Sequence, residues 1–486
     1  MRNWEIVLII VNFGLLYGVL IRRQKAGSTI RSLWPLFLGY TMVAGQIIIE
    51  GMSWRMIPAY FTIVLLTVYF YMGRNKVMRR KWSSVATQFV LLTIFLIISL
   101  IPPLVFPVFS LPEPTGDYSV GTVDYHWVDK NRTETSGDDS SAKRELMVKI
   151  WYPANAETEK PFNYYLDDVP EVRNTLAKQF NLPSFTMNHF DFVQTHSVTD
   201  SVLSQVQEPY PVLLFSHGFG VHRNQNIFQV EEFASHGYIV VSIEHTYYAG
   251  VTTFPDGRTV ELIEKDQDIS TAVMDAIMPI WTADASFVLD QLEILNQQDN
   301  RFSGKFDLER VGMFGHSFGG ANAYQMLMKD KRVKAAIDMD GGLFGEPLPD
   351  NGVGKPFFLM TADSTRNGEA VNKLLDSYSD QELIQLMGMN KEALQQYMDE
   401  LEARFLKSVV GGGLSIVIPN AGHHSFTDSS LYSPLLLTKN ENPTYNHQVI
   451  NEFTLAFFNQ HLKSADESIL TQLGQKYPEV DFTVNQ

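Results

Sequence analysis

The stretch that decides the fold is RVGMFGHSFGGANAY, residues 310–324. It consists of a short apolar run, the pentapeptide Gly315-His316-Ser317-Phe318-Gly319, and a tail of mostly small residues. In a Gly-x-Ser-x-Gly turn, a strand bends sharply into a helix and presents the serine in a strained conformation. Glycine two residues to either side avoids a collision there. A serine held in this way becomes a nucleophile when a base lies within hydrogen-bond reach. Ser317 is therefore the candidate nucleophile.

The composition divides the 486-residue chain into two unlike parts. Residues 1–110 carry 11 Lys or Arg and 2 Asp or Glu, whereas the remainder carries 27 and 52, out of totals of 38 and 54. The acidic remainder argues against nucleic acid as a partner, because phosphates need a basic surface. The chain has no cysteine, which excludes a disulfide framework, a thiolate nucleophile and a cysteine-ligated metal.

Four apolar runs fill residues 1–110 and predict about four transmembrane helices. Each run is close to the ~20 residues that span the hydrocarbon of a bilayer. No signal-peptide cleavage site follows the first run, which continues into basic residues. Pro102 and Pro103 interrupt the last run and are expected to end or kink its helix. The runs are Trp4–Ile21, Leu33–Ile49, Ile57–Met72 and Val85–Val108.

Basic residues in the connections predict how these helices are oriented, because loops rich in Lys and Arg stay in the cytoplasm. The first and third connections are basic, whereas the second has Arg55 alone, offset by Glu50. We therefore expect a multi-pass protein of the cell membrane whose acidic part lies outside the cytoplasm. No predicted span has an ionisable residue near its middle, which favours anchoring over transport. The basic residues are Arg22, Arg23, Lys25 and Arg31 in the first connection, and Arg74, Lys76, Arg79, Arg80 and Lys81 in the third.

Beyond a Pro- and Gly-rich linker, short apolar runs alternate with segments of helical spacing. Continuous apolar strands that alternate with helices are typical of an α/β fold, with a mostly parallel sheet covered on both faces. Such sheets carry their chemistry at the carboxyl ends of the strands, where Ser317, Asp340, Asp363 and His423 all lie. The apolar runs are ELMVKIWYPA, PVLLFSHGFG, YIVVSIEH, RVGMFGHS, VKAAIDMD, PFFLMTAD and LSIVIPNAGHH.

The base of a serine nucleophile is expected to follow the serine and its acid in chain order. The loop IPNAGHHSF offers His423 and His424 after a late strand, and we favour His423 with His424 as the alternative. The other histidines after Ser317 are His447 and His461, which lie in the final helical region.

The acid that orients the base has two candidates. Asp340 follows VKAAIDM and Asp363 follows FFLMTA one strand later, and spacing alone does not choose between them. Asp338 shares a strand face with Asp340 but lies further back within the strand.

The oxyanion of a tetrahedral intermediate needs two backbone N–H donors. One is expected from Phe318, the residue after the nucleophile, and the other from Phe219 in the glycine-rich turn FSHGFG. His217 and His245 are expected to be structural, because His217 precedes the turn and a lone histidine such as His245 is more often a buried residue with its hydrogen bonds satisfied.

With these residues placed, roughly residues 118–465 resemble the plasma-type (class II) platelet-activating-factor acetylhydrolase family, a branch of the α/β-hydrolases. The resemblance implies Ser317 as nucleophile, His423 as base through a His-x-x-Phe pattern, and Asp340 as acid, because the segment from the elbow to AAIDMDGG aligns without gaps. It places the second oxyanion donor on Phe219, where the family often has leucine. It also implies hydrolysis of short or oxidised acyl esters of phospholipids without a metal or other cofactor. The motifs that carry the resemblance are VKIWYPA, PVLLFSHGFGVHR, FASHGYIVVSIEH, GHSFGGANAYQML and GHHSFTD.

Two features depart from that family's pattern. The animal enzymes lack the four spans, and a helical insertion of about Gly368–Ser408 separates MTADST from SIVIPNAGHH. Its apolar positions predict an amphipathic cap, which either packs against the core or forms a lid over an acyl pocket. Those positions are Leu374, Leu375, Tyr378, Leu383, Leu386, Leu394, Met398, Leu401 and Phe405.

We therefore expect a membrane-anchored serine carboxylic-ester hydrolase of the α/β-hydrolase fold, whose partners are an ester or phospholipid substrate and the lipid bilayer. The alternatives are an acyltransferase or peptidase of the same fold, and an inactive hydrolase-fold membrane receptor. The intact serine, acid, histidine and oxyanion turn count against the receptor. The expected domains are 1–110 for the membrane region, 111–120 for a linker, 121–465 for the hydrolase and 466–486 for a C-terminal tail.

Overall fold

The structure is a computed structural model in which two compact units are distinguished. The first unit contains Met1–Ser110 together with Leu176–Val193 and Tyr432–Leu435, and the second contains the rest of the chain. Each unit is described by itself. The described residues are 1–21, 33–72, 82–137, 139, 141–156, 160–166, 171–206, 209–263, 270–366 and 375–485.

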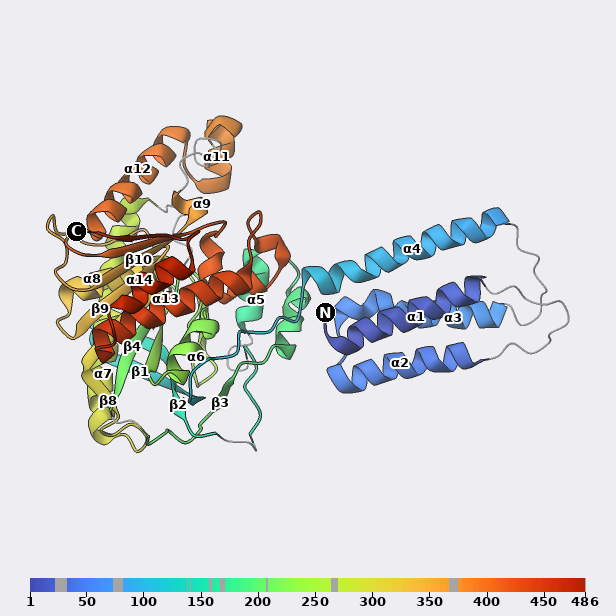
Figure 1. Cartoon of the computed structure of the whole chain (residues 1–486), viewed down its shortest axis with the longest axis horizontal. Coiled ribbons are helices and arrows are strands. Elements are labelled where there is room, and N and C mark those ends of the chain that lie inside the picture. Colours follow the sequence, from blue (N-terminus) through green and yellow to red (C-terminus); the bar gives the residue numbers. More distant parts are fainter. Residues whose placement is uncertain are drawn as a thin grey trace. The chain divides into compact units, whose positions relative to one another are not determined.

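The first unit contains four apolar helices, which Figure 1 shows side by side. They coincide with the four predicted runs. The last helix passes through Pro102 and Pro103 and ends a few residues later, so the prolines do not terminate it at once. The basic connections that carry the predicted orientation lie outside the described residues. The helices are α1 (Asn3–Ile21), α2 (Trp34–Glu50), α3 (Ile57–Met72) and α4 (Trp82–Val105), with a short 3-10 turn η1 (Trp54–Met56) before α3.

Four helices in the described part of the chain are long and apolar enough to cross a membrane, by length and composition alone. Three of them match predicted spans: Asn3–Leu20, Trp54–Tyr71 and Ser84–Val105. The fourth is Thr271–Gln298, which belongs to the second unit and packs into its core. The predicted second span, α2, is not among the four because it has only 17 residues.

Charged residues tie together one end of the four-helix unit. Arg55 donates to Glu5 at 2.6 Å, and both side chains are fully buried. The Glu50 carboxylate accepts the backbone N–H groups of Trp4, at 2.9 Å, and Glu5, at 3.1 Å, at the start of α1. A carboxylate there satisfies amides that have no partner within the helix and complements the helix dipole. Breaking a buried ion pair on one side typically costs about 3–5 kcal/mol, so this end of the unit is tightly specified.

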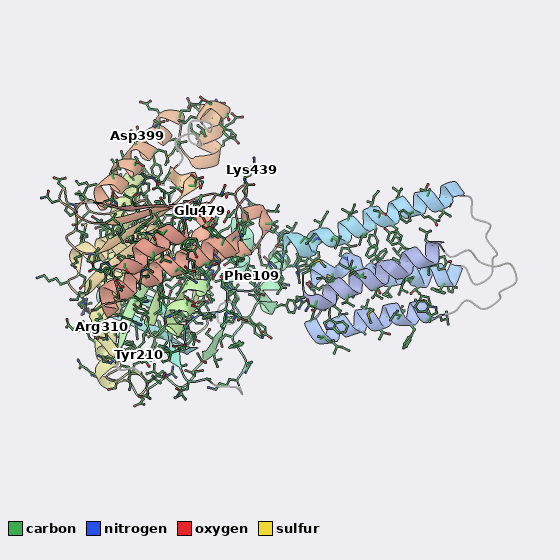
Figure 2. All side chains as sticks on the ribbon, in the orientation of Figure 1. Phe109, Tyr210, Arg310, Asp399, Lys439 and Glu479 are labelled. Carbon is green, nitrogen blue, oxygen red and sulfur yellow. The ribbon has the colours of Figure 1, made fainter. Side chains whose placement is uncertain are left out.

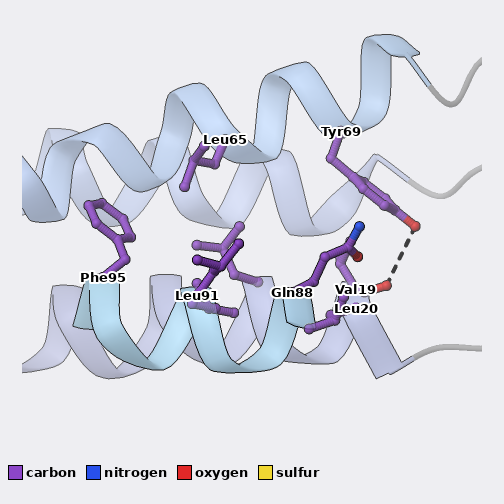
Figure 3. A pocket seen from close by; sticks show the side chains of 9 residues that line it. Val19, Leu20, Leu65, Tyr69, Gln88, Leu91 and Phe95 are labelled. Carbon is purple, nitrogen blue, oxygen red and sulfur yellow. Dashed lines mark hydrogen bonds between the residues drawn. The ribbon is translucent and has the colours of Figure 1, made fainter. Parts of the chain in front are cut away.

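A cavity of about 330 Å³ lies between α1, α3 and α4. Its lining is apolar except for Tyr69 and Gln88, which lie at one end of it (Figure 3). The Tyr69 hydroxyl donates to the Val19 carbonyl at 3.5 Å. None of the residues predicted to carry out chemistry lines this cavity. The other lining residues are Leu16, Leu20, Leu65, Leu91, Leu92 and Phe95.

The second unit is built on a ten-stranded sheet with the order β12-β11-β10-β9-β8-β4-β5-β2-β1-β3. The strands from β11 to β5 in that order are parallel, whereas β2 is antiparallel to β5 and β12 is antiparallel to β11. The strands are β1 (Ser119–Thr133), β2 (Lys143–Ala154), β3 (Ser197–Thr199), β4 (Tyr210–Ser216), β5 (Ile239–Glu244), β8 (Phe306–His316), β9 (Val333–Met339), β10 (Phe357–Ala362), β11 (Leu414–Ile418) and β12 (Asp481–Val484), with a separate hairpin of β6 (Val251–Thr253) and β7 (Thr259–Glu261).

All seven apolar runs that the sequence marks as strands form β2, β4, β5, β8, β9, β10 and β11. Every residue of β4, β5 and β10 is buried, as expected for parallel strands covered on both faces. Three strands of this sheet and the separate hairpin were missed. β1 mixes apolar and charged residues, β3 has only 3 residues, and β12 has only 4 residues. The expected C-terminal tail 466–486 instead contributes α14 (Ser468–Lys476) and β12, which pairs with β11.

Two pairs of helices cover the sheet. α7 (Thr271–Gln298) packs on α8 (Phe318–Lys329), and both contact β8. α6 (Ile227–Ser235) packs on α13 (Pro443–Lys463), and this pair lies in front of the sheet in Figure 1. Residues of α7 and α8 join sheet residues in one buried apolar cluster that includes Met278, Trp281 and Leu327. The elbow at Ser317 is therefore held between a buried strand and a buried helix.

The helical insertion forms α11 (Asp380–Met387) and α12 (Lys391–Ser408) after the short α9 (Asp363–Arg366). Leu401 and Phe405 of α12 join the main apolar cluster, while Leu383, Met389 and Leu394 form a small cluster of their own. The opposite face of α12 is solvated, and Figure 2 shows Asp399 there. These contacts favour packing against the core for α12. Leu374 lies outside the described residues. The remaining short helices are α5 (Glu171–Gln179), η3 (Ser184–Phe192), η4 (His423–Phe426), η5 (Asp428–Leu431) and η6 (Pro434–Leu436).

Candidate active site

Ser317 stands alone between the end of β8 and the start of α8. Its backbone has φ 57° and ψ −122°, a conformation that side-chain-bearing residues rarely adopt. Its N–H donates to the Met339 carbonyl at 2.9 Å, which fixes the turn against the end of β9. A Cβ atom on Gly319 would lie 2.0 Å from the Ser216 carbonyl oxygen, and one on Gly315 would lie 2.2 Å from the Gly319 carbonyl oxygen. Only glycine fits at both positions, as the sequence pattern predicts.

The structure pairs His423 with Asp340. His423 Nδ1 donates to Asp340 Oδ2 at 2.6 Å, and the Asp340 side chain is fully buried whereas 45% of the His423 side chain is exposed. The carboxylate also accepts the Ala362 N–H at 2.8 Å and the Thr365 hydroxyl at 2.9 Å. These bonds leave Nε2 as the acceptor of the ring, because a neutral imidazole has one donor and one acceptor nitrogen.

The rival residues occupy other environments. Asp363 begins α9 and is only half-buried. His424 lies beside Ser429, with its Nδ1 at 3.2 Å from that hydroxyl, and burial lowers the pKa of its ring. Asp338 is fully buried and accepts the Gly341 N–H at 2.7 Å, and burial together with the nearby Asp340 raises its pKa well above the ordinary value. Asp338 therefore supports the turn that follows Asp340.

The loop that carries His423 lies beside the elbow. His316, the residue before Ser317, donates from Nε2 to the His423 carbonyl oxygen at 2.9 Å. The rings of His316 and His423 have centroids 4.4 Å apart. The end of β8 and the loop after β11 therefore meet at one edge of the sheet, as expected for parallel strands.

The turn after β4 also lies against the elbow. A Cβ atom on Gly218 would be 3.4 Å from Ser317 Cβ, which brings residues 217–220 next to the serine. Phe219 N–H donates to no acceptor within the described part of the chain. Phe318 N–H is the first amide of α8, where helical amides have no partner within the helix. Phe219 and Phe318 therefore both lie close to Ser317 in the structure.

His217 orients the peptide group that contains the Phe219 N–H. Its Nδ1 donates to the Gly218 carbonyl oxygen at 2.6 Å, and its Nε2 accepts the His245 N–H at 3.2 Å. In a trans peptide the carbonyl oxygen and the following N–H point in opposite directions, so the bond to Gly218 directs the Phe219 N–H away from His217. Burial lowers the pKa of His217 well below its ordinary value, which keeps this single tautomer neutral.

A second serine, histidine and aspartate arrangement is buried beneath this turn. Ser216 Oγ lies 2.9 Å from His245 Nε2, and His245 Nδ1 donates to Asp284 Oδ2 at 2.9 Å. All three residues have zero exposure, so no substrate reaches them. Burial alone would raise the pKa of Asp284, but Arg144, which donates to it twice, and His245 hold that pKa below its ordinary value. This arrangement anchors strand ends, and the expectation that His217 and His245 are structural agrees with it.

Several residues of the site were not anticipated from the sequence. Thr365 and Ala362 hold the Asp340 carboxylate, and Gln225 accepts the Gly218 N–H at 2.8 Å. No sequence pattern marks these bonds: the two to Asp340 span 22 and 25 positions, and the one between Gly218 and Gln225 joins two loop residues seven positions apart. Asp284 did carry a signal, because it is an acid within the apolar helical run IWTADASFVLDQLEIL. Within the described residues, no group of three or more His, Asp or Glu side chains is arranged to hold a metal ion.

Aromatic side chains surround the elbow. The Phe318 ring lies 4.8 Å from Trp281, 5.9 Å from Phe219 and 5.9 Å from Phe344, measured between ring centroids. Phe219 is 36% exposed, so this apolar surface reaches solvent. Arg404 of α12 donates to the Leu343 carbonyl at 3.2 Å, which brings the insertion next to the segment that follows Asp340.

Comparison with known proteins identifies the family of this chain. The sequence model of the family described as platelet-activating factor acetylhydrolase, isoform II, matches residues 105–276 and 281–472. Platelet-activating factor acetylhydrolase from Cavia porcellus is 23% identical over 319 residues, which are 60% of this chain and 69% of that protein. A probable 1-alkyl-2-acetylglycerophosphocholine esterase from Arthroderma benhamiae is 25% identical over 410 residues, which are 77% of this chain and 94% of that protein.

A solved structure shares the fold. Ferulic acid esterase from Streptomyces cinnamoneus superimposes with a TM-score of 0.60 and 26% sequence identity, over 77% of this chain and 99% of that chain. The mixed sheet with helices on both faces is thus an α/β-hydrolase fold, and the matched family and this neighbour both hydrolyse esters. The chain belongs to the platelet-activating factor acetylhydrolase isoform II family and is a serine ester hydrolase.

Proposed function

We propose that this chain is a membrane-anchored hydrolase of short-acyl or phospholipid-type esters that acts through Ser317, His423 and Asp340. The observation that carries the proposal is the 2.6 Å bond between His423 Nδ1 and Asp340 Oδ2, in a loop that lies beside the elbow of Ser317. The proposed substrate class is supported by the names of two relatives, a platelet-activating factor acetylhydrolase and a probable 1-alkyl-2-acetylglycerophosphocholine esterase.

In the proposed reaction, Ser317 Oγ attacks the ester carbonyl while His423 Nε2 takes its proton. Asp340 holds the Nδ1–H tautomer and stabilises the imidazolium that forms. The N–H groups of Phe219 and Phe318 bind the oxyanion of the tetrahedral intermediate. His423 then returns the proton to the departing alcohol, and water repeats the sequence on the acyl-enzyme.

A panel of esters tests the substrate class. The purified full-length chain in detergent should hydrolyse nitrophenyl acetate and butyrate faster than the nitrophenyl esters of long acids. It should also release the short acyl group from phospholipids with a short sn-2 chain. Preference for long-chain esters would contradict the short-acyl assignment. Transfer of the acyl group to an added alcohol in preference to water would identify an acyltransferase, and cleavage of amides in preference to esters would identify a peptidase.

We further propose that residues 1–110 anchor the enzyme, that 111–120 link the two parts, and that the hydrolase begins near residue 121 and faces outward. Three predicted spans are long and apolar enough to cross a membrane, and 52 of the 54 Asp and Glu residues lie after residue 110.

Trypsin added to intact cells, with any wall removed, should cut the hydrolase while the membrane seals the first and third basic connections from the protease. The membrane protects these two connections because loops rich in Lys and Arg stay in the cytoplasm. Cleavage sites are mapped by mass spectrometry, with trypsin added after detergent lysis as the control that reaches every site. Cutting at residues 22–32 in intact cells while the hydrolase stays protected would reverse the orientation.

A further inference from the structure

Three hydrogen bonds connect the oxyanion turn to the loop of the proposed base through two buried side chains. Gly218 N–H donates to Gln225 Oε1 at 2.8 Å, and Gln225 Nε2 donates to His316 Nδ1 at 2.8 Å. His316 Nε2 then donates to the His423 carbonyl oxygen at 2.9 Å. Gln225 is 5% exposed and His316 is 3% exposed, so neither has water as a ready substitute partner. We call these two side chains the Gln225–His316 bridge.

The bridge has one consistent arrangement of hydrogens. A backbone N–H only donates, so the amide oxygen of Gln225 must face Gly218 and its amide nitrogen must face His316. An amide nitrogen also only donates, so His316 Nδ1 must be unprotonated, which leaves the hydrogen on Nε2. The His423 carbonyl only accepts, and it receives that hydrogen. Burial lowers the pKa of His316 well below its ordinary value, in agreement with a neutral ring.

Both ends of the bridge are backbone groups of the proposed machinery. Gly218 is bonded to Phe219, whose N–H is the proposed oxyanion donor, and His423 carries the proposed base. The backbone next to Gln225 holds the same loop, because Asp428 N–H donates to the Gln225 carbonyl at 3.1 Å and Asn226 Nδ2 donates to the Phe426 carbonyl at 2.7 Å. These neighbouring bonds fix the position of the loop as a whole. The bridge joins the N–H of Gly218 to the backbone carbonyl of His423.

We propose that Gln225 and His316 are positioning residues that set the spacing between the oxyanion donor of Phe219 and the base His423 on either side of Ser317. This inference rests on the proposed function of Ser317, His423 and Phe219. Neither bridge residue needs to touch the substrate. The groups that the bridge positions act most strongly on the transition state, so its loss lowers kcat and leaves KM nearly unchanged.

The test is a double-mutant cycle on the full-length chain in detergent, with Gln225→Leu, His316→Leu and the double variant. Active sites are counted by complete reaction with a fluorophosphonate, so that kcat is expressed per reactive serine. Each single variant should lower kcat by about 10–100-fold, because a misplacement of about 1 Å costs on that order. The double variant should resemble the more affected single variant, because either substitution already breaks the connection.

Gln325→Leu is the matched control. Gln325 is a buried glutamine of α8 whose amide donates to the Glu346 carbonyl at 2.9 Å, outside the bridge, so this variant should keep the parent kcat per reactive serine. If Gln225→Leu does not fold, Gln225→Glu replaces it, since that side chain has the same shape and still accepts from Gly218 N–H but no longer donates to His316 when ionised. Its kcat should also fall.

Two results would overturn the positioning role. One is a parent kcat per reactive serine in the folded Gln225 and His316 variants, even with a lowered melting temperature, which would make the bridge merely structural. The other is a double variant whose loss equals the product of the single losses. Failure of the proposed function is a separate result, because it would appear as undiminished labelling and turnover in Ser317→Ala.

Discussion

Replacement of Ser317 by alanine is expected to lower kcat by about 10⁶-fold, which is the scale of the loss when the protease subtilisin loses its nucleophilic serine. The elbow places Ser317 beside the loop of His423 and close to the turn that contains Phe219. No other serine in the described part of the chain has that setting. Ester hydrolysis and the incorporation of a fluorescent fluorophosphonate should both disappear, while circular dichroism and the melting temperature stay close to those of the parent protein.

Ser216→Ala is the informative control for this experiment. Ser216 also lies within hydrogen-bond distance of a histidine that contacts an aspartate, but all three residues have zero exposure. The Ser216→Ala variant should therefore retain labelling by the fluorophosphonate. Labelling that persists in Ser317→Ala and disappears in Ser216→Ala would exchange the roles of the two arrangements and refute the proposed nucleophile.

The second large effect is expected at Asp340. Asp340→Asn should lower kcat by about 10⁴-fold, because an asparagine in place of the carboxylate leaves the imidazole in the wrong tautomer, as the same substitution does in a serine protease. Asp340 accepts the Nδ1 hydrogen of His423, whereas Asp363 is half-buried at the start of α9. Turnover of the folded variants gives the measurement, with circular dichroism to verify folding.

Asp363→Asn is the matched control, since it is the same substitution at the end of the neighbouring strand. It should stay within a few-fold of the parent rate. If Asp363→Asn loses turnover while Asp340→Asn keeps it, the acid is Asp363 and the bond between Asp340 and His423 is not used in catalysis.

The sequence predicts the central strands well because these strands are buried on both faces. Continuous apolar runs then have no other stable place, and β4, β5 and β10 follow that rule at every residue. β1 was missed because it has buried and exposed residues in an irregular order, and β12 because its short run gains stability only from pairing with β11. The spacing of apolar residues predicts which face of a strand is buried. It does not predict which distant segment pairs with the edge of the sheet.

Some residues of the candidate site could likewise be predicted from the sequence, and others could not. The elbow of Ser317 was readable because its glycines are a local steric requirement, whereas spacing alone did not separate Asp340 from Asp363. The resemblance favoured Asp340, and the bond to His423 is a contact across 83 positions of the chain that no local pattern encodes. The bond of Thr365 to Asp340 across 25 positions and the bond of Gln225 to His316 across 91 positions were missed for the same reason.

The helix α7 shows that apolar composition alone does not identify a membrane span. This helix is long and apolar enough to cross a membrane, yet Trp281, Leu289 and Leu292 pack in the hydrolase core and Asp284 binds Arg144. Hydropathy shows how much apolar surface a helix must bury. It does not show whether protein or lipid covers that surface. The charged partner of Asp284 is the feature that assigns α7 to the protein interior.

Ser317 and Asp340 share a backbone feature, a φ angle of 57°, that places both in the left-handed region. Such conformations cost on the order of 1–3 kcal/mol each, although aspartate tolerates them better than most residues. A folded domain has a net stability of only about 5–15 kcal/mol, so this is a sizeable share of it. Glycine at either position would adopt this backbone without that cost. In the proposed mechanism both side chains take part in the reaction, so each turn keeps a less favourable backbone conformation for the sake of the group that it carries.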